Sequence, residues 1–218
     1  MTKSTFHHGN LKEESLRIAF DFIKNEDIEK LTLKIISDAT GTSRSAIYKH
    51  FSSKENLIET LIVDGLEQFD VYTSPTLRDS SLALVDRFYV AGKLYIKFAR
   101  ENPNLYRLLF GHKYAHIREA VINIKDEDCS GFGALKLAVE EGQSSGILKD
   151  ESSFTRTIII WSSLHGLSSL AIDGFMHVDK DVDEIYEELF SGLLNSAMSS
   201  KVKVISKIPI LRKLTQHS

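Results

Sequence analysis

The chain has 218 residues, of which 42% are hydrophobic and 26% are charged, and its formal net charge is −3. These values are ordinary for a globular chain with a full hydrophobic core, and they exclude binding of polyanions through the overall charge. Only three prolines and 12 glycines occur, which favours helices over a turn-rich β architecture.

Apolar residues recur at intervals of three and four along most of the chain, which is the spacing of helices. We expect a first helix at about residues 10–25. Thr32 is placed to cap a second helix ending at Ala39, because its hydroxyl can accept a bond from an unpaired N–H. We expect the small Ala39 to let this helix pass close to a third, with Gly41 at positive φ in the turn.

A third helix is expected at about residues 44–50, after a cap at Ser43. A fourth helix is expected to run to about residue 72. Ser52 and Glu55, at its start, have the spacing of a capping box.

The segment "TSPTL" at residues 73–77 is predicted to end the fourth helix, because proline disrupts helices. Longer helices are expected to follow at about residues 78–101, 153–174 and 182–199, with a brief helix starting at Pro103 and one or two helices over 114–145. Within the last of these segments, "CSGFG" is a candidate kink. The segment "EEGQSSGIL" is expected to be a loop.

The predicted fold is therefore all-α, with a three-helix helix-turn-helix DNA-binding domain over residues 1–55 and a connecting helix at about 53–72. Residues 73–200 are predicted to form a helical domain for ligand binding and dimerisation. Residues 201–218 hold five cations and no acid, so they are either a solvated tail or an arm for a membrane surface or a nucleic acid.

Two short helices joined by a turn that contains glycine describe a helix-turn-helix. Ile47 and Phe51, four residues apart, are expected to face inward and hold the third helix in place. Arginine can read guanine, and lysine, tyrosine and histidine can reach phosphates. The predicted DNA-binding residues are Thr32, Thr42, Ser43, Arg44, Ser45, Tyr48, Lys49, His50 and Lys54.

The positive charge around the turn is local. Residues 1–60 contain nine Lys or Arg and nine Asp or Glu, whereas residues 42–54 contain three cations and no acid. Three phosphate contacts supply a modest, salt-dependent affinity. The sequence therefore predicts that two copies bind one duplex.

The stretch "LTLKIISDATGTSRSAIYKHFSSKENLIETLI" resembles the DNA-binding domain of the TetR family of bacterial transcriptional regulators. The resemblance covers about residues 7–63 and is carried by Thr32, Gly41, Ser43, Ala46, Ile47, Tyr48, Phe51, Ser53, Lys54 and Glu55. Three residues depart from the family pattern. Asp27 stands where glycine is common, and Thr40 and Thr42 stand where alanine and valine are common.

"NPNLYRLLFG" and "WSSLHGLSSLAIDGF" resemble the effector domain of the TetR branch that is named for a Trp-His-Gly motif, here Trp161, His165 and Gly166. The resemblance implies a small-molecule effector and a homodimer held by the last two long helices. Trp161 and His165 either pack in the core or dimer seam or contact the effector directly. The candidate ligand-binding residues are Phe88, Tyr95, Phe98, Tyr106, Phe110, Trp161 and His165, and the candidate dimerisation residues are Trp161, Ile185, Leu189 and Leu193.

The family resemblance implies a repressor that binds a pseudo-palindromic, double-stranded operator as a dimer and is released by its effector. A two-fold dimer would place two reading helices about 34–36 Å apart, which matches successive major grooves. No cofactor is expected.

Two other functions stay open on the sequence. A helical adaptor that has lost DNA binding is compatible with the neutral first sixty residues. His112 and His116, four apart on an expected helix with Glu119 one turn on, could hold a metal. Because no His-Glu-x-x-His or glycine-rich phosphate loop occurs, we expect no catalytic or metal-binding residues.

The single Cys129 excludes an internal disulfide and fits a reducing compartment. The amino terminus lacks the apolar core of a secretory signal, and the longest apolar stretch is interrupted by serines and His165. We therefore expect a cytoplasmic protein without a membrane partner.

Overall fold

The computed structural model describes residues 11–122, 130–175 and 179–199. The described residues form ten α-helices and one short 3-10 helix, so the predicted all-α fold is confirmed. The predicted basic tail at residues 201–218 lies outside the described residues. Among the helices that are described, none is long and apolar enough to cross a bilayer.

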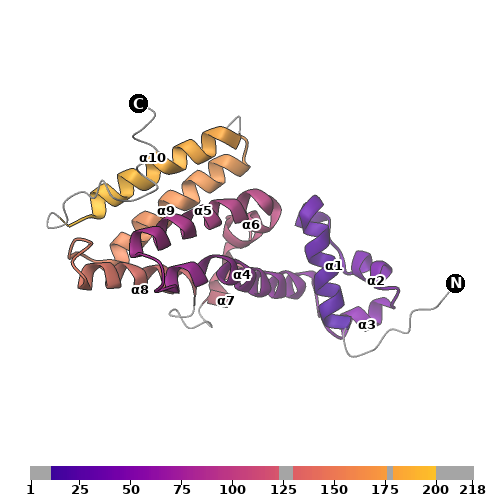
Figure 1. Ribbon diagram of the computed structural model, residues 1–218. Coiled ribbons are helices and arrows are strands. Elements are labelled where there is room, and N and C mark those ends of the chain that lie inside the picture. The colour runs from indigo at the N-terminus through magenta and orange to yellow at the C-terminus, as the bar shows by residue number, and fades with distance from the viewer. Residues whose placement is uncertain (1–10, 123–129, 176–178, 200–218) are drawn as a thin grey trace.

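The first four α-helices and the 3-10 helix η1 build the smaller end of the molecule and the connection to the larger end (Figure 1). They are α1 (Leu11–Asn25), η1 (Ile28–Lys30), α2 (Leu33–Thr40), α3 (Arg44–Tyr48) and α4 (Lys54–Arg78). The larger end contains α5 (Leu84–Glu101), α6 (Pro103–Phe110), α7 (Ala115–Ile122), α8 (Gly131–Ser144), α9 (Ser153–Ile172) and α10 (Asp179–Ala197). Figure 1 shows α9 and α10 side by side at the edge of the molecule farthest from α3.

The predicted caps of α2 and α3 are confirmed. The Thr32 hydroxyl accepts a hydrogen bond from the Ile35 N–H at 3.2 Å, and the Ser43 hydroxyl accepts one from the Ala46 N–H at 3.2 Å. Gly41 ends α2 at φ 66°, in the left-handed region that a side chain would disfavour. These local bonds set the angle at which α3 leaves α2.

The expectation that Ala39 lies between α2 and α3 is wrong, because Ala39 is exposed and Thr40 is the buried residue. Thr40 Oγ1 can donate to the Ile36 carbonyl at 2.9 Å and accept a hydrogen bond from Thr42 Oγ1, which lies 2.8 Å away. The two threonines that depart from the family pattern therefore satisfy each other's hydroxyls, while their methyl groups remain available for packing.

Asp27 also has a specific role in this structure. Its backbone is extended, with φ −65° and ψ 134°, so the chain does not need glycine at this position. The Asp27 carboxylate accepts a bond from the Glu29 N–H at 2.8 Å and caps η1.

The predicted start and end of the fourth helix are wrong. Ser53, not Ser52, caps α4, and its hydroxyl accepts from the Asn56 N–H at 3.1 Å. The helix continues through Pro75 to Arg78, because its last turns carry buried residues that pack on the larger domain. Water can satisfy the carbonyl that Pro75 deprives of a donor, since Val71 is an exposed residue.

Other helix limits in the larger domain also differ from expectation. The next helix, α5, begins at Leu84 rather than near residue 78. At "CSGFG" a helix begins instead of bending, because the Ser130 hydroxyl caps α8 at the Gly133 N–H, while Cys129 lies outside the described residues. The expected loop at residues 140–148 is helical as far as Ser144. Smaller shifts move α3, α9 and α10 by two or three residues at their ends.

The main hydrophobic core is continuous across both ends of the molecule. It joins Ile47 and Phe51 of the helix-turn-helix to Leu61 of α4, Leu109 of α6 and Tyr186 of α10. All but Tyr186, at 1%, are fully shielded from solvent. One continuous core therefore connects α3 to the larger domain.

A buried cation fastens the far end of α4. Arg87 of α5 is 6% exposed, and its Nη1 donates to the Leu77 carbonyl at 3.3 Å and to the Glu141 carboxylate at 2.9 Å. Arg87 thus connects α4, α5 and α8. These bonds hold the pKa of the Glu141 carboxyl below its ordinary value.

We predict that Glu141→Gln reduces the free energy of unfolding by about 1 kcal/mol at pH 7, since solvent screens this half-exposed carboxylate. The pKa of Glu141 is lower in the folded protein, so its contribution is present above the unfolded pKa and is lost as the pH falls. Urea unfolding at pH 7 and pH 3.5 should show a smaller difference between the proteins at pH 3.5. Glu184→Gln on the exposed side of α10 is the control, and equal effects of both variants would contradict the account.

Candidate functional site

The outward side of α3 carries the residues that the sequence predicts for DNA. Ser43, Arg44, Ser45, Lys49 and His50 are exposed. Tyr48 is 53% exposed, although it is a large aromatic residue. Ile47 and Phe51 are fully buried beneath them, as predicted, so this face is held by the core and points away from it.

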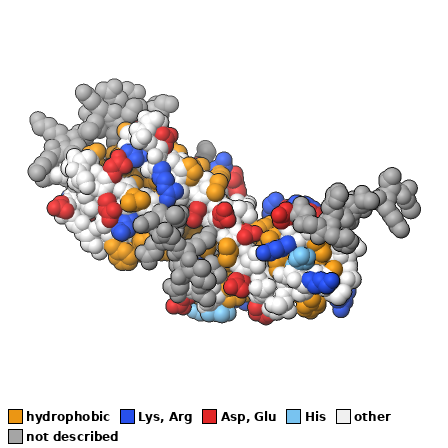
Figure 2. Space-filling view, turned by 90° about the horizontal axis from the view of Figure 1, so that it is seen from below, with side chains coloured by type: hydrophobic (Ala, Val, Ile, Leu, Met, Phe, Trp, Pro, Cys, Tyr) orange, Lys and Arg blue, Asp and Glu red, His pale blue; other side chains and the backbone are white. Residues whose placement is uncertain are grey.

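The cations of this face are available for a partner. The side chains of Arg44 and Lys49 make no hydrogen bond or ion pair with any other described residue, whereas Lys34 of α2 is paired with Asp38 at 3.0 Å. Figure 2 shows Lys, Arg and His side chains on the helix-turn-helix end of the molecule. An unpaired cation can donate to a phosphate or a base without first losing an internal partner.

Five of the predicted DNA-binding residues make side-chain hydrogen bonds within the protein, and the hydroxyls of Ser43 and Ser45 lie 2.9 Å apart. Thr32 and Ser43 cap helices through their hydroxyls, and the half-buried Thr42 bonds to Thr40. Lys54 Nζ donates to the Glu29 carbonyl at 2.6 Å. Thr32, Thr42, Ser43 and Lys54 position the face, and the residues that remain to contact DNA are Arg44, Ser45, Tyr48, Lys49 and His50.

The turn between α1 and α2 is tied to the larger domain. The Glu29 carboxylate accepts a hydrogen bond from the Tyr114 hydroxyl and an ion pair from Lys113 Nζ at 2.8 Å. Hydrogen bonds from Lys113, which has the larger effect, and from Tyr114 lower the pKa of Glu29. Asn104 of α6 donates to the Ile23 carbonyl at the end of α1, at 3.0 Å. We call this set of contacts the Glu29 junction.

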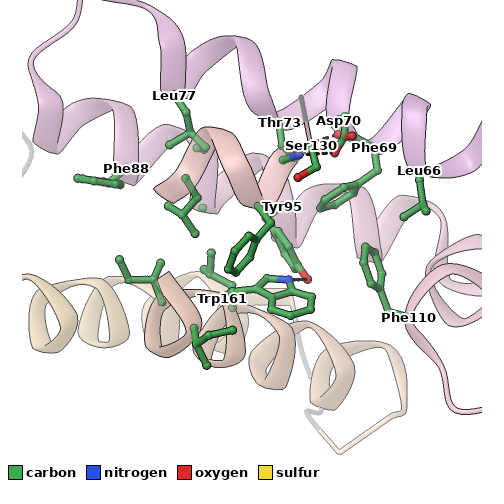
Figure 3. A pocket seen from close by; sticks show the side chains of 18 of the residues that line it. Leu66, Phe69, Asp70, Thr73, Leu77, Phe88, Tyr95, Phe110, Ser130 and Trp161 are labelled. Atoms are coloured by element: carbon green, nitrogen blue, oxygen red, sulfur yellow. Dashed lines mark hydrogen bonds between the residues drawn. The ribbon is translucent and has the colours of Figure 1, made fainter. Parts of the chain in front are cut away.

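A cavity of about 380 Å³ lies within the larger domain, between α4, α5, α8 and α9 (Figure 3). Four predicted ligand-binding residues line it, namely Phe88, Tyr95, Phe110 and Trp161. The other lining residues are Leu66, Phe69, Asp70, Thr73, Leu77, Ala91, Gly92, Ser130, Gly131, Phe132, Leu135, Phe154, Ile158, Ile160 and Leu164. Its volume suits a small organic molecule.

Three predicted ligand-binding residues do not line the cavity. Phe98 is 5% exposed and packs edge-on against Phe69, with ring centroids 5.1 Å apart. Tyr106 is 1% exposed, and the ring of His165 stacks on it. These side chains fill the core behind the cavity wall, because each is taken up by another ring.

A chain of hydrogen bonds leads from the cavity wall into that core. Trp161 Nε1 donates to the Tyr95 hydroxyl at 3.1 Å, the hydroxyls of Tyr95 and Tyr106 are 3.0 Å apart, and the Tyr106 hydroxyl is 2.6 Å from His165 Nδ1. Burial and the positive charge of Arg118 lower the pKa of His165. The neutral imidazole can therefore accept a hydrogen bond from the Tyr106 hydroxyl. Burial raises the pKa of Tyr95 to about 12.

One wall of the cavity escaped the sequence analysis. It consists of α4 residues spaced by three and four, which are Leu66, Phe69, Asp70, Thr73 and Leu77. That spacing is a helical stripe, whose first three residues lie within the helix predicted to about residue 72. Continuing this helix through Pro75 would have added Thr73 and Leu77 to the stripe. The sequence analysis also did not identify Phe132 of α8 and Phe154 of α9 as cavity residues. Their ring centroids lie 5.9 Å apart in the structure.

The outer side of α9 and α10 exposes apolar side chains. Ile159, Leu170 and Ile185 are between 39% and 48% exposed. A Cβ atom added to Gly166 of α9 or Gly192 of α10 would meet nothing within 4 Å. Of the other predicted dimerisation residues, Leu189 and Leu193 are half-buried, and Trp161 faces the cavity.

The histidines considered for a metal are not on one helix. His112 precedes α7, and only His116 lies within it. Within the described part of the chain, no three His, Cys, Asp or Glu side chains form a group that could hold a metal.

Comparisons with known proteins agree with this arrangement. A family model described as "Bacterial regulatory proteins, tetR family" matches residues 16–61, and one described as "Tetracyclin repressor-like, C-terminal domain" matches residues 89–193. The Trp-His-Gly branch stays a prediction.

Curated relatives of the chain match it over about half of its length. The nucleoid occlusion factor SlmA of Vibrio cholerae is 30% identical over 104 residues, which are 47% of this chain and 53% of that protein. SlmA of Aliivibrio fischeri is 31% identical over 104 residues, with the same shares. The chain thus spans about half the length of the curated relatives that it matches.

Similar structures extend over most of the chain. A protein of unknown function from Rhodococcus sp. RHA1 has a TM-score of 0.76 at 20% identity, covering 90% of this chain and all of that one. The fatty acid degradation regulator FadR from Bacillus halodurans has a TM-score of 0.69 at 13% identity, covering 85% and 95%. At such identities the likeness shows the fold alone.

We predict that His165→Gln reduces the loss of stability on acidification. Because the pKa of His165 is lowered on folding, the unfolded chain binds the proton first as the pH falls below about 6.5, and wild-type stability falls there. Urea unfolding at pH 7.5 and pH 5.5 should give a larger loss for the wild type than for His165→Gln. The control is His112→Gln at an exposed position, and the same loss in all three proteins would contradict the prediction.

Proposed function

The chain belongs to the tetR family of bacterial regulatory proteins, and we propose that it is a ligand-responsive transcriptional repressor of the bacterial cytoplasm. In this proposal it binds a pseudo-palindromic operator as a homodimer and leaves it when a small molecule fills the cavity. The observation that carries the proposal is the exposed side of α3, with Arg44 and Lys49 unpaired above a buried Ile47. The family and the fold are those of regulators and not of enzymes.

The chemistry of this side of α3 suits the major groove. Arg44, in the first turn of α3, can donate two hydrogen bonds to the O6 and N7 atoms of guanine. Ser45 and the exposed Tyr48 can contact bases or phosphates beside it, and Lys49 can neutralise a phosphate. Because these cations have no partner among the described residues, binding DNA does not cost an internal ion pair.

The outer side of α9 and α10 supports the proposed dimer. Exposed Ile159, Leu170 and Ile185 give it an apolar surface, and the open space above Gly166 and Gly192 lets helices of a second copy approach closely. A two-fold axis there would make the interface self-complementary and place two copies of α3 on one face of the assembly.

Packed helices connect the cavity to the DNA-binding face of α3. Helix α4 lines the cavity with Phe69 and Asp70, and its first turns contribute to the same hydrophobic core as Ile47 of α3. The Glu29 junction provides a second connection from α6 to the end of α1. A ligand that binds more tightly to one arrangement of these helices shifts the dimer toward it and changes the spacing of the two reading helices.

We predict different effects for the two unpaired cations on DNA binding. Arg44→Ala should weaken binding to the preferred promoter site by about 1–3 kcal/mol and relax the choice of base, because it removes a base contact. Lys49→Ala should weaken all sequences alike and reduce the salt dependence, because it removes a phosphate contact. Fluorescence anisotropy with promoter and scrambled duplexes over a range of salt concentrations measures both effects.

The matched control for both is Lys97→Ala, which removes an exposed cation from α5 in the larger domain. The proposal fails if neither Arg44→Ala nor Lys49→Ala changes binding to any promoter fragment.

We predict that Ile185→Glu disrupts the dimer, because it places a charge on the proposed apolar interface. Sedimentation velocity should show a shift toward monomer, and promoter affinity should fall about tenfold or more. Leu137→Glu introduces the same charge at a residue of α8 that is 49% exposed, and it should remain dimeric. A monomeric wild type, or a dimeric Ile185→Glu protein, would rule out this interface.

A further inference from the structure

The cavity of the larger domain is longer than it is wide. Its lining residues on α4 extend from Leu66 to Leu77, which is about 16 Å at the rise of an α-helix. Those on α9 extend over a similar length, from Phe154 to Leu164. A volume of about 380 Å³ spread over that length forms a narrow passage rather than a round chamber. The space therefore suits an extended occupant better than a compact one.

Aromatic rings stand at both ends of this passage. Phe110 lies at one end and Phe88 at the other, with Tyr95 and Trp161 between them (Figure 3). Phe88 belongs to α5 and is half-buried. Its ring therefore limits how far an extended occupant can reach in that direction.

A second, smaller cavity begins on the other side of Phe88. It has a volume of about 40 Å³ and lies between α5, α9 and α10. Phe88, Ile160 and Leu164 line both cavities, so these three side chains form a partition between them. Tyr186 and Phe190 of α10 line the smaller cavity. Removal of the Phe88 ring would join the two spaces and extend the passage toward α10.

The polar groups of both walls are already engaged. Among the described residues, the polar side chains that line the larger cavity are Asp70, Thr73, Tyr95, Ser130 and Trp161. Each makes a hydrogen bond within the protein, and Asp70 and Ser130 take part in further interactions. In the smaller cavity, the Tyr186 hydroxyl donates to a backbone carbonyl at 2.6 Å. An occupant therefore gains affinity chiefly by burying apolar surface, at about fourfold for each methylene group.

We propose that the larger cavity binds a molecule with a long, unbranched alkyl chain, and that Phe88 limits the length of that chain. The chain lies along α4 and α9, and its end meets the Phe88 ring at the partition. This inference deepens the proposed function and rests on it, because it names the chemical class of the effector and the residue that selects it.

The chain contains its own reporter of cavity occupancy. Trp161 is the single tryptophan of the sequence and lines the larger cavity. Its fluorescence can be titrated with hexanol, octanol, decanol, dodecanol and tetradecanol, which share one uncharged headgroup. Each addition of two carbons should tighten binding by more than about tenfold while the chain still fits. The gain should stop near dodecanol, whose extended length is close to that of the cavity, and we call this length the cut-off.

The variant Phe88→Ala tests the assigned residue. Because it opens the partition, the cut-off should move to longer chains, and tetradecanol should bind at least about tenfold more tightly to the variant than to the wild type. Octanol is too short to reach the partition, so its affinity should change less than about threefold. Phe88→Leu keeps an apolar side chain of intermediate size, and it should move the cut-off in the same direction.

The matched control is Phe175→Ala. This phenylalanine is 75% exposed and lines neither cavity, so the control protein should keep the wild-type cut-off. If Phe88→Ala does not fold, the comparison of Phe88→Leu with the wild type decides the question.

Three results would overturn the inference. These are no fluorescence change with any alkanol, a wild-type affinity that does not depend on chain length, and one cut-off shared by the wild type and the folded Phe88 variants. Retardation of promoter DNA by the ligand-free protein is measured separately. If that retardation occurs and the alkanol titrations fail, only the ligand class is wrong; if it does not occur, the proposed function itself fails.

Discussion

The continuity of α4 is the constraint on which the rest of the structure depends. Its 25 residues span about 37 Å at the usual rise of an α-helix. Leu57 and Leu61 near its start are fully buried with the helix-turn-helix, whereas Asp70 and Leu77 line the cavity. Because one hydrogen-bonded rod belongs to both sites, a displacement at the cavity end must either move the reading end or be absorbed by its packing.

Two sets of contacts decide which of these occurs. Arg87 fastens the far end of α4 to α5 and α8, and the Glu29 junction fastens α1 to α6. The hydrogen bonds from Trp161 to His165 connect the cavity wall to α6 through Tyr106. A ligand changes DNA binding only by its difference in affinity for the two arrangements, typically about 1–3 kcal/mol. Few contacts are needed for an effect of that size.

Local chemistry made the reading face predictable, and tertiary packing limited the prediction elsewhere. The caps at Thr32 and Ser43 and the inward Ile47 follow from bonds and spacing within a few residues. The end of α4 does not, because burial on α5 and α8 outweighs the disruption by Pro75. Aromatic residues occur at helical spacing throughout the larger domain, both on the cavity wall and in the core. The sequence pattern therefore could not distinguish Trp161, which lines the cavity, from Tyr106, which is buried behind it.

We propose that two copies of the α3 face read one duplex, because within the part of the chain that the structure describes the α3 face of each copy presents two unpaired cations, Arg44 and Lys49, above its buried core. Hydroxyl-radical footprinting of the promoter with the ligand-free protein tests this claim most directly. The account predicts two protected segments whose centres lie about 10 base pairs apart, or a multiple of that spacing. A single protected segment, at protein concentrations that saturate the site, would contradict it.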